Sequence, residues 1–302
     1  MANVQDPPSP KLPPSPRLRT DKSEGQSKFN SVWVSHSSIG DFLKCPRLYY
    51  LHNVYKNEKG RKINITSPAL SLGIAVHETL ENLSKFKAEE RFLKPLEEAF
   101  EENWKKVAGK LGGFKSAEEE ATAKERGRNM ILRVAKNPGP LAQKTVKLPP
   151  AHNDMPPNFF LSEEENIILN GKIDWLEYIP EDDSVRVIDF KTGRNKETEG
   201  SLQLPIYLLL LNNLQKRKVS SAAYWYLDCD DKPMPVELPD ITKARDTVLE
   251  IARKIKIARE KKEFACPRGE AGCFGCRPFE KILKGEAEFI GIGGYGQEMY
   301  IV

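Results

Sequence analysis

Long apolar runs are missing from this chain of 302 residues. The longest candidate, residues 208–211, is far shorter than the roughly 18 apolar residues that a membrane-spanning helix needs. The start of the chain also lacks the apolar core of a secretory signal. We therefore expect a cytoplasmic protein without a membrane partner. A phosphate-binding P-loop is absent as well, so that any motor activity would belong to another chain.

Cysteine is scarce, and neither sign of charge dominates. Thiols stay reduced in the cytoplasm, and the five cysteines are therefore interpreted as metal ligands or buried thiols rather than as a disulfide framework. The formal net charge of +4 is only mildly basic. Such an excess permits binding to nucleic acid but does not predict it.

Residues 1–28 differ in composition from the rest of the chain. They are rich in proline, serine and charge and contain few apolar residues. Because such a segment cannot offset the entropy lost on ordering, we expect a disordered tail. Its Pro-x-x-Pro pattern suits a linker or, as the alternative, a peptide ligand. Residues 29–302 are expected to form the folded domain.

The first part of that domain, about residues 35–148, is predicted to be helical. Apolar residues recur there at intervals of three and four, which is the helical period. The serines from Ser35 to Ser38 offer N-caps for the first helix, and a second helix restarts at Pro46. Further helices are expected at about 68–85, 92–107 and 117–135.

Between about residues 158 and 240 the pattern changes to β-branched and aromatic segments separated by polar turns. Strands are expected at 158–162, 167–178, 185–191 and 222–228, with a helix at about 201–216. The second and third strands would form a hairpin across residues 180–184. A charged helix at about 242–262 and a cysteine-containing segment make up residues 241–302. This order predicts an α/β fold with a mixed sheet flanked by helices and an N-terminal helical part.

Asp189 and Lys191 are alternate residues of an expected strand and therefore share a face. In an apolar strand both charges are costly unless they are paired or used. Asp174, on the expected hairpin partner, can approach them. Two carboxylates suit a hard cation such as Mg²⁺, and a lysine beside them can stabilise charge in a transition state. The alternative is an ordinary ion pair at the end of a surface hairpin.

His77, Gln203 and Tyr207 are further candidates with a weaker signal. His77 lies in an expected helix, where a lone histidine is usually a core residue. Gln203 and Tyr207 are four residues apart on one helix face, directly after the Asp-x-Lys strand. Such a pair is also common in plain packing.

Five short motifs follow one another along the chain. They are Cys-Pro-Arg-x-Tyr from residue 45, Gly-x-x-x-His from 73, Gly-x-x-Asp from 171, Asp-x-Lys-Thr-Gly from 189 and Gln-x-x-x-Tyr from 203. Each alone is weak, but the ordered set is specific. It resembles the PD-(D/E)XK nuclease superfamily, and in particular the RecB-like nuclease domain of helicase-nucleases and CRISPR-associated exonucleases. The resemblance extends from Ser35 to about Leu283 and implies a restriction-endonuclease-like sheet flanked by helices.

The resemblance implies a metal site for Mg²⁺ or Mn²⁺. Its ligands fall on the side chains of His77, Asp174 and Asp189, and the backbone carbonyl of Phe190 is implied as an additional ligand.

The resemblance also implies catalytic roles. Asp174 and Asp189 belong to the catalytic set, and Lys191 matches the catalytic lysine. Gln203 and Tyr207 match a motif that orients this lysine or contacts the DNA backbone. No expected active-site residue is missing, which implies an active enzyme.

The cysteines match the family in part. Related proteins often hold a [4Fe–4S] cluster with one cysteine from the Cys-Pro motif and three near the C-terminus. Cys45, Cys273 and Cys276 match, but Ile282 stands where the last cysteine would be, and Cys266 is expected to supply the fourth thiolate. Four thiolates suit iron–sulfur or zinc, with iron–sulfur favoured by the resemblance, and thiols without metal are the remaining alternative. Such a centre would join the N-terminal helices to the C-terminus.

We therefore expect a metal-dependent deoxyribonuclease that hydrolyses phosphodiester bonds, as an exonuclease or on single strands and ends, in DNA repair, recombination or related processing. Its expected partners are DNA and a separate helicase. One alternative is a non-catalytic DNA-binding module of a helicase-nuclease complex, against which the complete set of metal and lysine residues argues. The other is cleavage of RNA, which these residues do not exclude.

Overall fold

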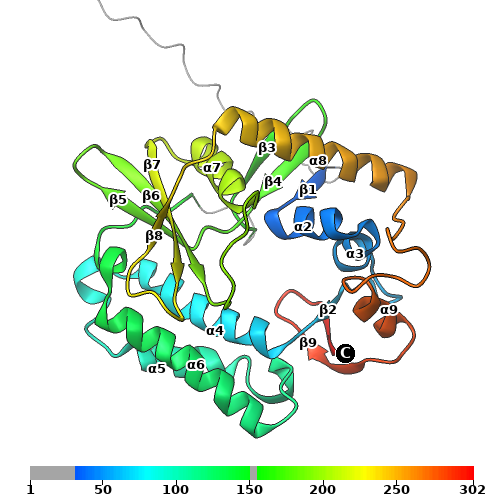
Figure 1. Ribbon diagram of the computed structural model, residues 1–302, viewed down its shortest axis with the longest axis horizontal. Coiled ribbons are helices and arrows are strands. Elements are labelled where there is room, and N and C mark those ends of the chain that lie inside the picture. Colours follow the sequence, from blue (N-terminus) through cyan, green and yellow to red (C-terminus); the bar gives the residue numbers. More distant parts are fainter. Residues whose placement is uncertain (1–30, 150–154) are drawn as a thin grey trace, which may run out of the picture. The chain divides into compact units, whose positions relative to one another are not determined.

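A computed structural model describes residues 31–149 and 155–302 of the chain (Figure 1). The expected tail at residues 1–28 lies outside these residues. No helix in the described part is long and apolar enough to cross a membrane. All the elements below belong to one unit, Val32–Val302.

The first elements follow the N-cap and proline signals of the sequence. Strand β1 (Val32–Val34) is followed by helix α2 (His36–Lys44), helix α3 (Pro46–Tyr49) and a π-helical turn, η1 (Tyr50–Val54). Ser35 caps α2 reciprocally, because its hydroxyl accepts from the Ser38 N–H while the Ser38 hydroxyl accepts from the Ser35 N–H. The expected restart at Pro46 is confirmed.

Three longer helices pack against one face of the central sheet. They are α4 (Pro68–Glu81), α5 (Leu96–Lys105) and α6 (Ala117–Lys136). Short 3-10 turns join them to their neighbours: η2 (Asn82–Lys85), η3 (Ala88–Glu90), η4 (Gly109–Gly112) and η5 (Gly139–Ala142). Gly127 of α6 allows the close approach of α5, since a Cβ there would lie 2.8 Å from the Phe100 ring.

The central sheet has the strand order β5-β6-β7-β8. Its strands are β5 (Trp175–Ile179), β6 (Ser184–Lys191), β7 (Val219–Tyr226) and β8 (Met234–Val236). The predicted hairpin of β5 and β6 is confirmed as an antiparallel pair. Helix α7 (Gln203–Leu214) connects β6 to β7, which run parallel. The sheet is therefore mixed, as expected.

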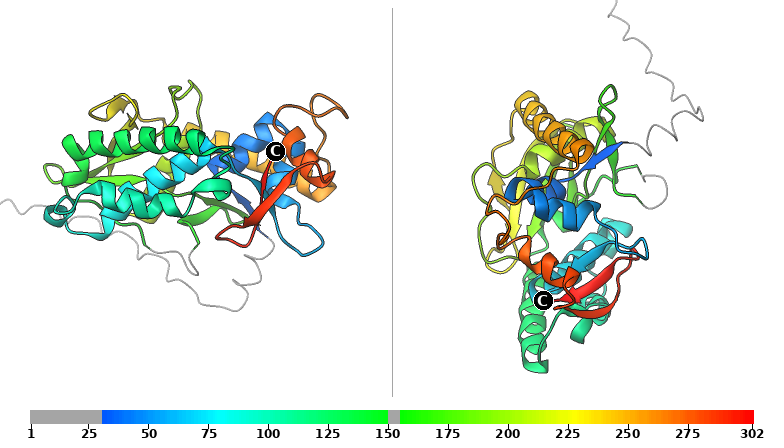
Figure 2. Two further views of the ribbon diagram at one scale, coloured as in Figure 1. Left: turned by 90° about the horizontal axis from the view of Figure 1, so that it is seen from below. Right: turned by 90° about the vertical axis from the view of Figure 1, so that its right-hand side faces the viewer.

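The two faces of the sheet contribute to two different cores. Ile188, Phe190 and Trp225 pack with helices α4 to α6. On the other face, Val187 and Ala222 pack with α7 and the long helix α8 (Ile241–Lys261). Figures 1 and 2 show these helices on either side of the strands. This layered arrangement confirms the predicted α/β class.

The expected strand at 167–178 is in fact two strands in different sheets. Strand β4 (Ile167–Asn170) lies between β1 and β3 (Asn158–Ser162), and β5 begins the central sheet. Gly171, at the break, passes so close to α7 that a Cβ would lie 2.8 Å from Leu210. The prediction of one continuous strand was wrong because the apolar pattern continues across this change of sheet.

The C-terminal segment forms elements that the sequence pattern did not predict. They are α9 (Arg277–Leu283), β9 (Glu288–Ile292) and β10 (Glu298–Ile301). Strand β10 pairs antiparallel with β9 and parallel with β2 (Ile63–Ile65). The end of the chain thus lies beside the segment that precedes α4 (Figure 1).

Candidate functional site

The end of β6 carries Asp189 and Lys191 on one face of the strand. The side chain of Asp189 is only 1% exposed, and its Oδ2 lies 3.0 Å from the Lys191 Nζ. The predicted pairing of these two side chains is therefore present in the structure. An aspartate this deeply buried requires compensation from its neighbours.

Helix α7 supplies part of that compensation from its first two turns. Gln203 Nε2 donates to Asp189 Oδ1 at 2.5 Å, and the Tyr207 hydroxyl donates to the same oxygen at 3.1 Å. Gln203 Oε1 accepts a hydrogen bond from Lys191 Nζ at 2.5 Å. Gln203 therefore bridges the aspartate and the lysine, and its i, i+4 spacing with Tyr207 places both over the end of β6.

The second carboxylate oxygen of Asp189 is left without a hydrogen bond. Oδ2 is fully buried and, despite its distance to Lys191, accepts no hydrogen bond of regular geometry. Burial and the negative charge of Asp174 raise the pKa of Asp189 to about 7. The Lys191 ammonium offsets the charge of this oxygen from 3.0 Å, and the lone pair left without a hydrogen bond suits a bound cation.

His77, Glu81 and Asp174 meet beside this network. The His77 Nδ1 lies 3.4 Å from Asp174 Oδ1 and 3.6 Å from Glu81 Oε1. Together the three side chains offer ligand atoms that all lie within 4.8 Å of one another. Burial alone would lower the pKa of His77, but Asp174 and Glu81 outweigh it and raise this pKa to about 10.

Asp174 connects the two groups of side chains. It precedes β5, and its Oδ2 accepts a hydrogen bond from the Phe190 N–H at 2.8 Å. This bond fixes the Asp174 carboxylate against the stretch of β6 between Asp189 and Lys191. The Phe190 ring contacts His77, with ring centroids 6.0 Å apart. A role of the Phe190 carbonyl as a ligand stays a prediction.

Glu81 and Glu197 belong to the site but were not singled out from the sequence. Glu81 ends α4 one turn after His77, and this i, i+4 spacing is a signal that could have identified it. Glu197 lies in the loop after β6, where its carboxylate pairs with Lys191 Nζ at 2.5 Å and its N–H donates to the Tyr226 hydroxyl. No periodic pattern marks Glu197.

Lys191 is held by three oxygen atoms, from Asp189, Gln203 and Glu197. It also lies 4.9 Å above the ring of Tyr224. Burial lowers the pKa of Lys191, but Asp189 and Glu197 more than compensate and raise it. The lysine is therefore a fixed cation, oriented from several directions.

We call His77, Glu81, Asp174 and Asp189 the carboxylate site, of which the first three have ligand atoms within 4.8 Å of one another and Asp189 lies outside that close group. Its mixture of one imidazole and three carboxylates suits a divalent cation such as Mg²⁺ or Mn²⁺. The buried Asp189 oxygen without a hydrogen bond and the close group of His77, Glu81 and Asp174 both fit such an ion. The carboxylate site can thus bind a cation beside a positively charged lysine.

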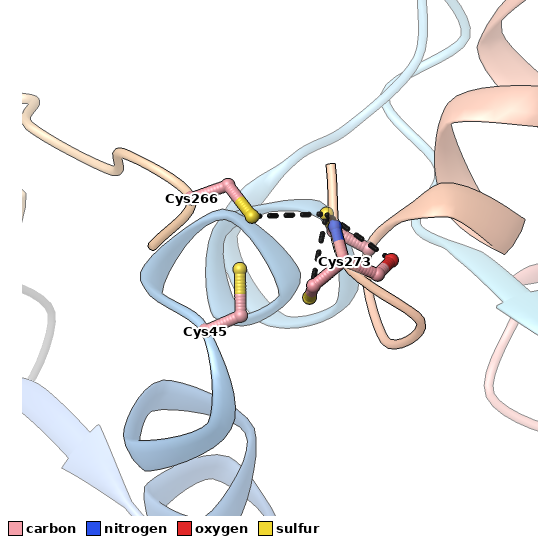
Figure 3. A group of neighbouring side chains, drawn as sticks. Cys45, Cys266 and Cys273 are labelled. Carbon is pink, nitrogen blue, oxygen red and sulfur yellow. Dashed lines mark hydrogen bonds between the residues drawn. The ribbon is translucent and has the colours of Figure 1, made fainter. Parts of the chain in front are cut away.

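The four predicted cysteine ligands also come together. The Sγ atoms of Cys45, Cys266, Cys273 and Cys276 all lie within 4.8 Å of one another (Figure 3). Cys276 Sγ is 3.7 Å from Cys273 Sγ and 3.8 Å from Cys266 Sγ. We call these four residues the thiol site.

The thiol site lies among apolar side chains that include Leu48, Leu51 and Phe279. Backbone hydrogen bonds lower the pKa of Cys273 to about 7, whereas burial raises the pKa of Cys276 to about 12. Four clustered thiols in an apolar pocket suit a structural metal centre.

Two comparisons with known proteins bear on these sites. A family model described as the PD-(D/E)XK nuclease superfamily matches residues 33–279. This range contains every residue of the carboxylate and thiol sites. A search of curated proteins found no match.

Proposed function

Because the chain belongs to the PD-(D/E)XK nuclease superfamily, we propose that it is a Mg²⁺- or Mn²⁺-dependent deoxyribonuclease. The observation that carries this proposal is the buried Asp189, bound by Lys191, Gln203 and Tyr207 and lying next to Asp174. A plain surface ion pair would not need to be buried or to keep an oxygen without a hydrogen bond. The network is costly to fold and is accounted for by use in chemistry.

In this proposal the carboxylate site holds the divalent cation. Asp189 and Asp174 are its central ligands, and His77 and Glu81 complete the site from α4, with the Phe190 carbonyl as a further ligand. The cation would lower the pKa of the attacking water and neutralise charge on the phosphoryl oxygens. His77 must give up its proton to act as a ligand, so that metal and protons compete for the site.

Lys191 is proposed to stabilise the negative charge that develops on the phosphoryl group. Its ammonium is fixed by Asp189, Gln203 and Glu197 before substrate arrives. Such preorganisation is effective because no group has to reorient during the reaction. Gln203 and Tyr207 act as positioning residues, since they hold Asp189 and, through Gln203, the lysine.

The finer assignments rest on the sequence motifs. The five ordered motifs support a RecB-like enzyme in which residues 29–302 form one nuclease domain after the tail. We propose that it acts as an exonuclease or on single strands and DNA ends, in repair, recombination or related processing in the cytoplasm. A separately encoded helicase is the proposed partner.

We further propose that the thiol site holds a structural metal. Two of its Sγ spacings, 3.7 and 3.8 Å, match the edge of a tetrahedron around one zinc ion, about 3.8 Å for Zn–S bonds of about 2.3 Å, and the others are below 4.8 Å. In a [4Fe–4S] cluster each thiolate binds a different iron, and so the sulfurs must stand further apart. Zinc therefore fits these positions better than the cluster implied by the family resemblance. Measuring iron, sulfide and zinc in anaerobically purified protein distinguishes the two.

The nuclease proposal is tested with single-stranded DNA, double-stranded DNA and single-stranded RNA, each labelled at its 5′ or 3′ end. We expect DNA to be cleaved with Mg²⁺ or Mn²⁺ and to stay intact with EDTA. Release of label from one end only would identify exonuclease polarity. DNA that is bound but never cleaved would favour the non-catalytic module, and preferential cleavage of RNA would overturn the DNA assignment.

A further inference from the structure

Tyr295 is the most exposed of the large apolar and aromatic side chains in the described part of the chain, at 95%. It lies at the tip of the β9–β10 hairpin, in the sequence Gly293-Gly294-Tyr295-Gly296. The turn is ordered by its own hydrogen bonds, because Gln297 Oε1 accepts from the Tyr295 N–H and the Gln297 carbonyl accepts from the Gly293 N–H. The ring is thus held away from the body of the domain by a defined turn.

A cleft of about 530 Å³ adjoins this tip. Its walls come from three segments that are distant in sequence: the start of α2, the chain from η1 to β2, and the β9–β10 turn. The lining residues used below are His52, Lys56, Arg61, Lys62 and Tyr295. These five of the twelve lining residues are basic or aromatic.

The positive charge of this cleft is only partly neutralised. Two carboxylates lie nearby, but Asp41 is engaged by His52 and Glu298 by Arg61 and Tyr300. Lys56 and Lys62 form no ion pair with any described residue. Loss of water around Lys62 lowers its pKa, as do the charges of Lys56 and Arg259, which shows that like charges are gathered here.

Lys172 links the surroundings of the tip to those of the carboxylate site. Lys172 forms an ion pair with Glu81, which belongs to that site. Asp174 and Tyr295 both lie within electrostatic range of Lys172. Lys172 is therefore in range of both the β9–β10 tip and the carboxylate site.

We propose that the β9–β10 tip and the basic cleft bind single-stranded nucleic acid next to the carboxylate site, with a base stacked on Tyr295 and phosphates held by Lys56 and Lys62. This inference rests on the proposed nuclease function and specifies how its substrate is held. An exposed aromatic ring beside unpaired cations is the arrangement by which proteins bind single strands without reading their sequence. A paired duplex offers no free base face to such a ring.

The test measures binding of a fluorescein-labelled oligothymidylate by anisotropy, with EDTA present so that no strand is cleaved. Tyr295→Ala should weaken binding about 10-fold, the loss typical for one stacked base, while Tyr295→Phe should bind like the parent. Replacing both Lys56 and Lys62 with alanine should reduce the slope of log K against log salt by about 1.4, because each phosphate contact on a single strand contributes about 0.7.

Phe86 provides the matched control. It is 55% exposed and lines a different basic cleft with Lys85, Lys87 and Lys144. Phe86→Ala should leave binding unchanged. If Tyr295→Ala binds like the parent, or if Phe86→Ala weakens binding instead, the inference is overturned and the strand follows another path. Loss of binding in Tyr295→Phe would likewise exclude stacking as the cause. Because binding is measured without metal, these results are independent of whether the carboxylate site cleaves DNA.

Discussion

The carboxylate site and the thiol site are built in opposite ways. The carboxylate site gathers charged side chains at the end of a central strand and leaves one buried Asp189 oxygen without a hydrogen bond. The thiol site lies in an apolar pocket and connects α3 to the segment before α9. We expect the first arrangement to cost stability and the second, with its proposed metal bound, to add to it. We therefore expect damage to the carboxylate site to abolish chemistry, and damage to the thiol site to unfold the domain.

Among changes that leave the metal ligands in place, replacing Lys191 should have the largest effect on the cleavage rate. Lys191→Ala should reduce the cleavage rate on the order of 10²–10³-fold, because it removes one preorganised charge from the transition state. Affinity for Mn²⁺ should change little, which isothermal titration would show. If the variant cleaves at the parent's rate, Lys191 has no role in the cleavage reaction.

A Cys276 variant tests the expectation that the thiol site stabilises the fold. Cys276→Ser should lower the free energy of unfolding by roughly 4 kcal/mol or more, as expected when a structural metal ligand is lost. The rate per folded molecule should stay close to that of the parent. The matched control is Cys229→Ser, an exposed cysteine outside the thiol site, which should stay within about 0.5 kcal/mol of the parent. If the two variants are equally stable in denaturant titration, the thiol site is an ordinary group of thiols without a structural metal.

A Glu81 variant tests whether α4 contributes a ligand to the cation in the carboxylate site. Glu81→Gln should raise the Mn²⁺ concentration for half-maximal cleavage about 10-fold and preserve the rate at saturating metal, because a peripheral ligand is weakened while Lys191 and its partners are unchanged. Glu78→Gln, on the same helix but paired with Lys106, is the control and should not change the metal dependence. A parent-like Glu81 variant would place the cation away from α4.

The alternation of side-chain directions along β6 was sufficient to predict that Asp189 and Lys191 lie together. The helical spacing of Gln203 and Tyr207 likewise placed both side chains on one face of α7. These signals are local, since they depend only on the period of one strand or helix. Most of the helices, the hairpin and the α/β class could be predicted for the same reason.

Contacts between distant segments could not be predicted in this way. The parallel pairing of β2 with β10 and the ion pair of Lys191 with Glu197 leave no period in the sequence. The end of β4 at Asn170 was missed because the close packing of the next residue, Gly171, against Leu210 is a contact between distant segments. The meeting of Cys45 with Cys266 was expected from family resemblance, not from the local pattern.

Proton binding provides a further expected effect, on stability rather than on cleavage. Asp189 has its pKa raised from 3.8 to about 7, and His77 from 6.5 to about 10. Folding of the metal-free protein therefore favours the protonated form of both. Asp189 loses this contribution as pH rises from about 4 to 7, and His77 loses its contribution as pH rises from about 6.5 to 10.

The melting temperature of metal-free protein should accordingly fall as the pH rises from about 5 to 9. Added Mn²⁺ should raise it more at high pH than at low pH, because the ligands must lose their protons to bind. Asp189→Asn should reduce the change in melting temperature with pH at the acidic end of this range. An increase in metal-free stability with pH over this range would contradict the proton assignments.

The most direct test of the carboxylate site is the cleavage rate of end-labelled single-stranded DNA by the parent and by Asp189→Asn at saturating Mn²⁺. The account predicts rapid cleavage by the parent and a loss of roughly 10³-fold or more in the variant, with DNA affinity retained because phosphate contacts are spread over many residues. The metal-free variant should be at least as stable as the parent, since a costly buried charge has been removed. Equal cleavage by the two proteins would contradict the assignment of Asp189 and, with it, the proposed active site.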